Sequence, residues 1–125
     1  MNSRKTIVFV DDEPEVRDIA SMVLRSVGYE VHAAGNGNDA LWLLHQHSPQ
    51  VRLVITDFLM PGMSGLELAN TVRELHPNVS IILASGYADL VPDRREDLNF
   101  VDKPFDFELL LKKVETIFAH GQVLS

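Results

Sequence analysis

The 125-residue chain contains no cysteine, which excludes disulfide bonds, thiolate metal sites and cysteine-based catalysis. It has no apolar run long enough to cross a membrane, and no signal-like apolar stretch follows the N-terminal Met1–Lys5. Basic residues are few, since 11 lysines and arginines stand against 18 acids, for a net charge of -7. A basic face for nucleic acid is therefore not expected. We expect a cytoplasmic protein that contacts neither nucleic acid nor membrane directly.

The remaining composition is ordinary for a globular domain. Hydrophobic residues make up 46% of the chain and charged residues 23%. A chain of this length can bury a sizeable core, and it shows no linker, low-complexity segment or internal repeat. We therefore predict one domain over residues 1–125.

Short apolar, β-branched runs alternate with segments of helical periodicity. The predicted strands are Thr6–Val10, Tyr29–Ala34, Val51–Ile55, Val79–Ala84 and Phe100–Val101. The predicted helices are Glu15–Val27, one from a cap at Asn38 or Asp39 to about His47, Leu66–Leu75, and one from Asp106 to about Ala119. Their inward-facing stripes are predicted to include Ile19, Val27, Leu66 and Leu109.

The segment Tyr87–Asn99 lies between the fourth and fifth predicted strands. Pro92 in its middle is tolerated only in the first turn of a helix, which leaves about two turns. We therefore expect a shortened, mobile fourth helix there.

Strands that alternate with helices predict a parallel sheet covered on both faces. The expected fold is an α/β, (βα)5 doubly wound, five-stranded sheet of order 2-1-3-4-5, which is flavodoxin-like. Its ligand crevice lies between the carboxyl ends of strands one and three. Asp11 and Asp12 follow the first of these strands and Asp57 follows the other, so the three carboxylates should converge.

Converging carboxylates repel one another unless a cation lies between them. Hard oxygen ligands with spare coordination positions suit Mg²⁺, which is often shared with phosphate oxygens. Ser85 ends the fourth strand and Lys103 follows the fifth, so a hydroxyl and an ammonium group reach the same edge. This set predicts that Asp57 acts as a nucleophile and forms an aspartyl phosphate.

Four stretches spread along the whole chain carry a family resemblance. They read VDDEP at 10–14, VITDFLMPGMSGLEL at 54–68, ILASGYA at 82–88 and FVDKPF at 100–105. Together they resemble the receiver domains of two-component response regulators. The SGYAD wording at 85–89 looks like receivers attached to hybrid histidine kinases, and a single-domain regulator is the other possibility kept open.

The resemblance implies a role for each residue of the acidic edge. Asp57 would accept phosphate, Asp12 would bind Mg²⁺ directly, and Asp11 would bind it mainly through water. The main-chain carbonyl of Leu59 would complete the protein ligands.

The resemblance also implies how the phosphoryl group is held. Ser85 and the amide of Gly86 would bind its oxygens, and Lys103 would pair with its charge. The Lys103–Pro104 bond is expected to be cis. Ser85 and Phe100 would form the switch; Phe100 stands where the family often has tyrosine, so a switch there would be steric.

The implied function is a phosphorylation-activated signalling switch, which is not an enzyme beyond its own phosphorylation and slow dephosphorylation. Its donor would be a histidine kinase or a histidine phosphotransfer protein, and an unknown downstream protein would bind the changed surface. We expect a monomer or a weak, phosphorylation-dependent dimer. Three alternatives stay open. A Mg²⁺-dependent phosphohydrolase would need a substrate cap, for which the chain has no room, and an FMN carrier would have an acidic phosphate loop here. A non-phosphorylated pseudo-receiver is the third, and the intact set of acids argues against it.

The five histidines are scattered along the sequence. His45 and His47 are two positions apart on a predicted helix and so do not share a face. We expect surface roles for the histidines and no metal ligation.

Overall fold

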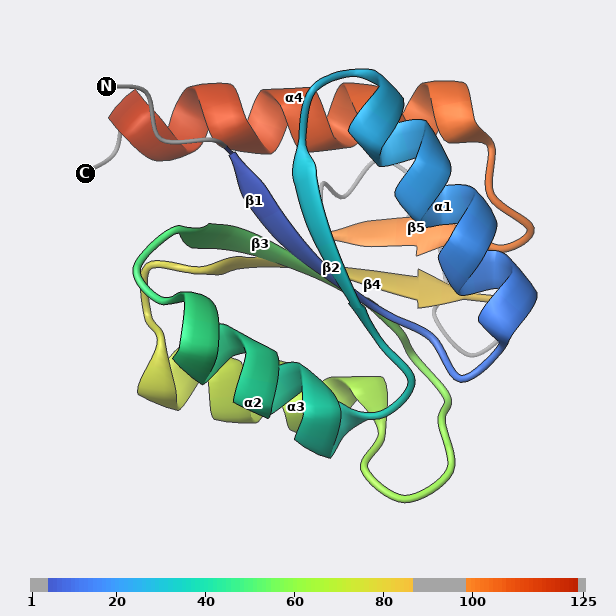
Figure 1. Cartoon of the computed structure of the whole chain (residues 1–125), viewed down its shortest axis with the longest axis vertical. Coiled ribbons are helices and arrows are strands. Elements are labelled where there is room, and N and C mark those ends of the chain that lie inside the picture. Colours follow the sequence, from blue (N-terminus) through green and yellow to red (C-terminus); the bar gives the residue numbers. More distant parts are fainter. Residues whose placement is uncertain (1–4, 87–98, 124–125) are drawn as a thin grey trace.

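The computed structural model describes residues 5–86 and 99–123. Within these ranges the chain forms five strands and four helices, which alternate along the sequence except where two strands follow one another (Figure 1). In chain order they are β1 Thr6–Val10, α1 Pro14–Ser26, β2 Glu30–Ala34, α2 Gly37–His47, β3 Val51–Asp57, α3 Gly65–Leu75, β4 Ser80–Ser85, β5 Phe100–Asp102 and α4 Phe107–Val123. No helix in the described ranges is both long enough and apolar enough to span a bilayer.

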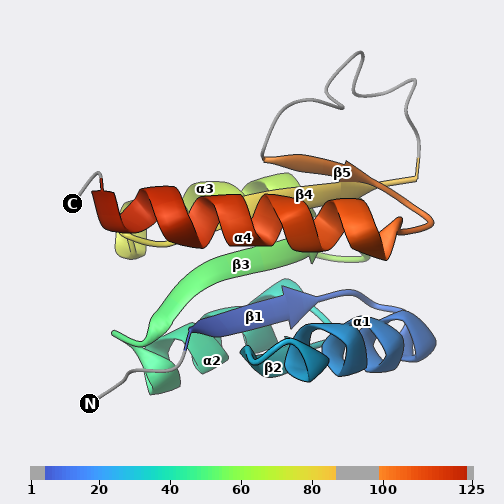
Figure 2. The same ribbon diagram turned by 90° about the horizontal axis from the view of Figure 1, so that it is seen from above.

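All strand pairs are parallel, and their order is β2-β1-β3-β4-β5, which confirms the predicted doubly wound sheet. Helices α1 and α4 cover one face, and α2 and α3 cover the other (Figures 1 and 2). The shortened helix predicted between β4 and β5 falls on residues 87–98, which lie outside the described residues.

Strand β1 shows why the central strands are apolar throughout. All five of its residues are buried. Ile7 and Phe9 pack in the core cluster beneath α1 and α4, whereas Val8 and Val10 pack in the cluster beneath α2 and α3. Side chains of a strand point alternately to the two faces, so a strand covered on both faces has no polar side.

The helix starts are set by local hydrogen bonds. The side chain of Asn36 accepts a hydrogen bond from the amide of Asp39, so α2 begins two or three residues earlier than a cap at Asn38 or Asp39 would place it. Ser64 and Glu67 form a reciprocal capping box at the start of α3. This box fixes the end of the loop that leaves Asp57.

Four apolar residues predicted to face inward are instead exposed. Leu109 shows the reason, because it precedes the fully buried Leu110 by one residue, which is about 100° around the helix. Val27 lies beyond the last turn of α1, at the C-cap, where the backbone is no longer helical. The exposed residues are Ile19, Val27, Leu66 and Leu109.

The β4–β5 edge is anchored where the described chain resumes. The side-chain amide of Asn99 donates to the carbonyl of Ile81, and the amide of Leu83 donates to the carbonyl of Asn99. These bonds hold β5 in register with β4, with Ala84 opposite Val101 and Ser85 opposite Asp102. The register places Lys103 directly beyond the end of β4.

Candidate functional site

The carboxyl ends of β1, β3, β4 and β5 meet at one edge of the sheet. Val10 is paired with Thr56, and Asp57 is paired with Ala84. The residues that follow these pairs are therefore brought side by side, although Asp11 and Lys103 are 92 positions apart in the sequence. Parallel pairing alone predicts this meeting of strand ends.

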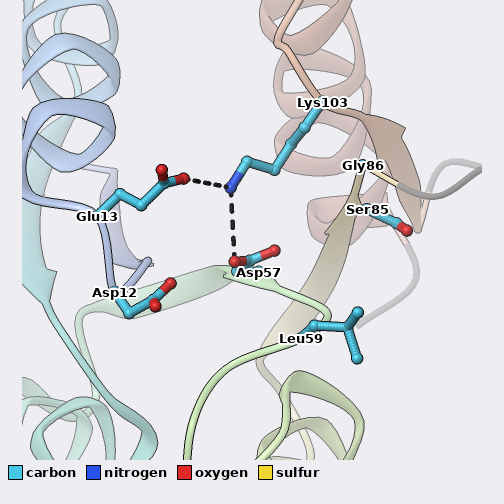
Figure 3. A pocket seen from close by; sticks show the side chains of 7 residues that line it. All are labelled: Asp12, Glu13, Asp57, Leu59, Ser85, Gly86 and Lys103. Carbon is cyan, nitrogen blue, oxygen red and sulfur yellow. Dashed lines mark hydrogen bonds and ion pairs between the residues drawn. The ribbon is translucent and has the colours of Figure 1, made fainter.

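A cavity of about 490 Å³ opens at this edge (Figure 3). Six of its lining residues were predicted site residues, and one, Glu13, was not. The lining residues are Asp12, Glu13, Asp57, Leu59, Ser85, Gly86 and Lys103. Asp11 lies behind the lining, almost fully buried, and reaches the site through Lys103.

Asp11, Asp12 and Asp57 each offer a carboxylate oxygen, and these oxygens lie within 4.8 Å of one another. Asp11 is 1% exposed, whereas Asp12 is exposed to solvent. Three acids at this spacing suit a hard divalent cation that keeps part of its water shell. The donor set therefore fits Mg²⁺, with Asp12 on the open side.

Lys103 is the cation of the site. Its Nζ donates to Oδ2 of Asp11 at 2.8 Å and lies 3.5 Å from both Oε1 of Glu13 and Oδ2 of Asp57. Burial lowers the pKa of Lys103, but the hydrogen bond and charge of Asp11, with the charges of Asp57 and Glu13, outweigh burial and raise its pKa overall. Lys103 is therefore protonated, and its positive charge offsets the negative charges of Asp11, Glu13 and Asp57.

The negative charge of Asp57 is only partly compensated by Lys103. Burial raises its pKa, Lys103 lowers it, and the charges of Asp11 and Asp12 raise it again, so that the net pKa lies above its ordinary value. Its side chain is 12% exposed. An additional cation beside Asp57 would relieve this repulsion, which is what the open side of the cluster allows.

Two residues that the sequence did not single out position Asp11. The amide of Glu13 donates to Oδ1 of Asp11 at 2.9 Å, and Nη1 of Arg17 donates to the main-chain oxygen of Asp11 at 2.7 Å. Arg17 passes Gly35, where an added Cβ would lie 3.0 Å from Nη1. Glu13 completes a run of three consecutive acids, a sequence signal that could have found it. No local signal connects Arg17 with Asp11 or with Gly35.

The loop after β3 depends on Gly65. A Cβ at this position would lie 2.1 Å from the main-chain oxygen of Asp57 and 2.9 Å from Cα of Phe58. The Gly65 amide donates to the carbonyl of Phe58 at 3.0 Å. Only glycine permits this approach, so Gly65 fixes the backbone that carries Asp57.

Lys103, Ser85 and Gly86 are placed by the β4–β5 edge. The amide of Lys103 donates to the carbonyl of Ser85 at 2.9 Å, and the Lys103–Pro104 bond is cis, as the family resemblance predicted. Phe105 then packs edge-on against Phe9 and anchors the loop. In Figure 3 the Ser85 hydroxyl is turned away from Asp57, so contact with a group on Asp57 needs a side-chain rotation.

Phe100, the predicted switch residue, is partly buried and packs against the core cluster beneath α2 and α3. Its main-chain oxygen accepts a hydrogen bond from the ammonium of the buried Lys113 on α4. The backbone of β5 is thus tied to α4 on one face of the sheet, while the Phe100 ring contacts the other.

Comparison with known proteins agrees with this geometry. Residues 7–115 match the response regulator receiver domain family. The chain is 33% identical over 121 residues to the sensor kinase CckA of Brucella abortus, covering 92% of this chain and 13% of that protein. It is 32% identical over 125 residues to the probable transcriptional regulatory protein TcrX of Mycobacterium tuberculosis, covering 96% of this chain and 52% of that protein. The chain thus spans about half or less of these curated relatives.

Among solved structures, the response regulator TrrA of Thermotoga maritima, in complex with Mg²⁺-BeF, superposes with a TM-score of 0.77. It is 37% identical, and the match covers 90% of this chain and 98% of that one. The doubly wound fold, with an acidic cluster and a lysine at its switch point, is compatible with a phosphoacceptor domain. The chain belongs to the response regulator receiver domain family.

Receiver domains act as phosphorylation switches of two-component systems, bind Mg²⁺ and are phosphorylated by histidine kinases. Family membership favours a phosphoacceptor over the phosphohydrolase and flavin-carrier alternatives. The described sheet edge of this chain contains three clustered acids and a lysine.

Proposed function

We propose that residues 1–125 form one receiver domain in which Asp57 accepts a phosphoryl group in a Mg²⁺-dependent reaction. The observation that carries this proposal is the position of Asp57, with Oδ2 3.5 Å from Nζ of Lys103 and within a cluster of carboxylate oxygens that span no more than 4.8 Å. The cavity beside it is open enough to admit a phosphoryl group.

A histidine kinase or a histidine phosphotransfer protein supplies the phosphoryl group. An oxygen of Asp57 attacks phosphorus, a new P–O bond forms, and the P–N bond to the donor imidazole breaks with its electron pair remaining on that nitrogen. Mg²⁺ would be held by Asp11, Asp12, Asp57 and the Leu59 carbonyl, and would supply positive charge to offset the charge on the phosphoryl oxygens. Asp12 provides the accessible ligand, and Asp11 acts mainly through water.

The remaining residues hold the transferred group. The ammonium of Lys103 pairs with one phosphoryl oxygen, and the Ser85 hydroxyl and the Gly86 amide donate to another. The Ser85 side chain must rotate toward Asp57 for this contact. The ring of Phe100, on the adjoining strand β5, then moves in response to the space that Ser85 leaves. The surface around β4 and β5 changes as a result, and an unidentified downstream protein reads the change.

The chain acts as a switch and not as an enzyme on other substrates. We further propose that it works as a monomer or a weak phosphorylation-dependent dimer, without direct contact with nucleic acid or membrane. The excess of acidic over basic residues supports the absence of direct contact with nucleic acid.

Intact mass after incubation with acetyl phosphate and Mg²⁺ tests the proposal. Wild type and Asp57→Asn are compared with Asp18→Asn, which removes an exposed acid on α1 away from the cavity. Wild type and Asp18→Asn should each gain one phosphate, whereas Asp57→Asn should gain none. Labelling of Asp57→Asn at the wild-type rate would show that another residue is the acceptor.

A further inference from the structure

A second cluster of metal-ligating side chains lies away from the phosphoacceptor site. Glu30 and His32 come from β2, and His47 is the last residue of α2. One ligand atom from each lies within 4.8 Å of the other two. Glu30 opens its strand, so the cluster lies toward the amino end of β2, whereas the acids of the phosphoacceptor site follow the carboxyl ends of their strands.

The fold brings these three residues together from two elements. Glu30 and His32 are two positions apart on a strand and therefore point to the same face. That face is the one beneath α2, because Ala34, two positions further on, packs with Ala40 and Leu44 of that helix. His47 ends the helix directly above.

The contacts within the cluster are close. Nε2 of His32 lies 2.8 Å from Oε2 of Glu30, and the imidazole rings of His32 and His47 stack with centroids 3.8 Å apart and planes 16° apart. The side chains of His32 and Glu30 are 25% and 35% exposed, so a dissolved ion can reach them. Two imidazoles and a carboxylate held this way form a compact donor set that still meets solvent.

We propose that Glu30, His32 and His47 bind a divalent transition metal, with Zn²⁺ as its representative. Imidazole nitrogen with carboxylate oxygen is a donor set of intermediate softness, which suits Zn²⁺, Co²⁺, Ni²⁺ or Cu²⁺ and not the oxygen-seeking Mg²⁺. Three protein ligands leave a fourth tetrahedral position for water or for a ligand from another molecule. The site is independent of the proposed phosphotransfer.

The geometry needs only small adjustments. Zinc–ligand bonds of about 2.0–2.1 Å place neighbouring tetrahedral donors about 3.3 Å apart, close to the present spacing of His32 and Glu30. The metal replaces the hydrogen that His32 and Glu30 share, and the ring proton of His32 resides on Nδ1. The stacked rings must also tilt, so that a ring nitrogen of His47 turns toward the same point.

The surroundings favour a cation. The C-terminal end of α2 carries partial negative charge from its unpaired carbonyls, and His47 lies at that end. The net charge of -7 further attracts cations to the protein. A bound metal would join the edge strand β2 to α2 and stabilise the folded chain by mass action.

Calorimetric titration of the full chain with Zn²⁺ tests the site, with excess Mg²⁺ present to occupy the acids around Asp57. The variants are His32→Ala, His47→Ala and Glu30→Gln, and the matched control is His45→Ala, an exposed histidine on the same helix. Loss of a mere outer-shell partner weakens metal binding by about tenfold or more, so removal of either ligand histidine should weaken it at least as much, and His45→Ala should leave it unchanged. Co²⁺ should give the intense visible absorption of a tetrahedral site.

A second measurement covers variants that fold poorly. In ¹⁵N-labelled wild type, Zn²⁺ should shift the ring nitrogens of His32 and His47 together, while His45 and the β3 amides stay in place. The proposal is overturned if wild type binds no Zn²⁺, if the His32→Ala and His47→Ala variants bind Zn²⁺ as tightly as wild type, or if His45→Ala weakens binding as much as they do.

Discussion

Lys103 is closer to Asp11 than to Asp57: its Nζ lies 2.8 Å from Oδ2 of Asp11 and 3.5 Å from Oδ2 of Asp57. The closer partner is also the more deeply buried, since Asp11 is 1% exposed. In the unphosphorylated protein Lys103 therefore compensates a buried charge first. A phosphoryl group on Asp57 would compete with Asp11 for the same ammonium, and this competition is a direct way for phosphorylation to change the structure.

The first prediction concerns loss of that ammonium. Lys103→Ala leaves Asp11 buried without its ion-pair partner, and breaking a buried pair costs about 3 kcal/mol of unfolding free energy. Mg²⁺ should restore part of the loss, because it supplies positive charge to the same acids. Urea unfolding with and without Mg²⁺ measures both effects. The exposed Lys112→Ala serves as the control, and an equal, small effect of both substitutions would contradict this role of Lys103.

The second prediction concerns the charge of Asp57. Its pKa in the folded protein is raised above the ordinary value of 3.8, chiefly by burial. A carboxyl group with a raised folded pKa stabilises the fold fully below its unfolded pKa, and that stabilisation is lost as pH rises through the folded pKa. At neutral pH the ionised Asp57 therefore costs stability.

Asp57→Asn should accordingly raise the melting temperature of the Mg²⁺-free protein at neutral pH, by about a few degrees. The advantage over wild type should shrink as pH falls toward the ordinary carboxyl value, where Asp57 becomes protonated. Thermal unfolding followed by circular dichroism at several pH values measures it. If Asp57→Asn is less stable than wild type at neutral pH without metal, the explanation by burial and repulsion is wrong.

The position of Asp57 could be predicted because it depends on pattern alone. Asp57 and Asp11 each come at the end of a β-branched run, on two different strands. Parallel pairing of these strands places both carboxylates at one sheet edge. The same rule brought Lys103 to that edge across 92 positions of sequence. Topology supplies these meetings without any knowledge of side-chain packing.

The contact between Arg17 and Asp11 and the stacking of His32 on His47 could not be predicted in this way. They depend on the angle at which a helix lies on the sheet and on rotamers, neither of which is encoded in hydrophobic periodicity. The prediction of surface roles for the histidines considered only spacing along one helix. His45 and His47 are two positions apart and do not share a helix face, but the stacking partner of His47 is His32 on a strand.

The third prediction concerns the acidic cluster. Mg²⁺ that binds only the folded protein should stabilise it by about 2.7 kcal/mol at one hundred times its dissociation constant. Asp12→Ala removes the exposed ligand and should reduce this gain clearly. Glu15→Ala, an exposed acid in the first turn of α1, should gain as much as wild type. Melting curves over a Mg²⁺ series give the comparison, and equal gains in all three proteins would place the metal elsewhere.

The last prediction concerns the glycine beneath Asp57. A methyl group at Gly65 would lie 2.1 Å from the main-chain oxygen of Asp57, which is backbone and cannot swing aside as a flexible side chain would. Gly65→Ala should therefore destabilise the protein by about 2–3 kcal/mol, because the loop and the start of α3 must move apart. Gly86→Ala is the matched control in the same cavity: the nearest atom to its added Cβ is the Lys103 Cβ at 4.0 Å, so little stability should be lost. The displaced Asp57 backbone should also slow phosphorylation by acetyl phosphate in the Gly65→Ala variant. Equal stability of the two variants in urea unfolding would show that the β3–α3 loop adapts freely and that Gly65 does not fix Asp57.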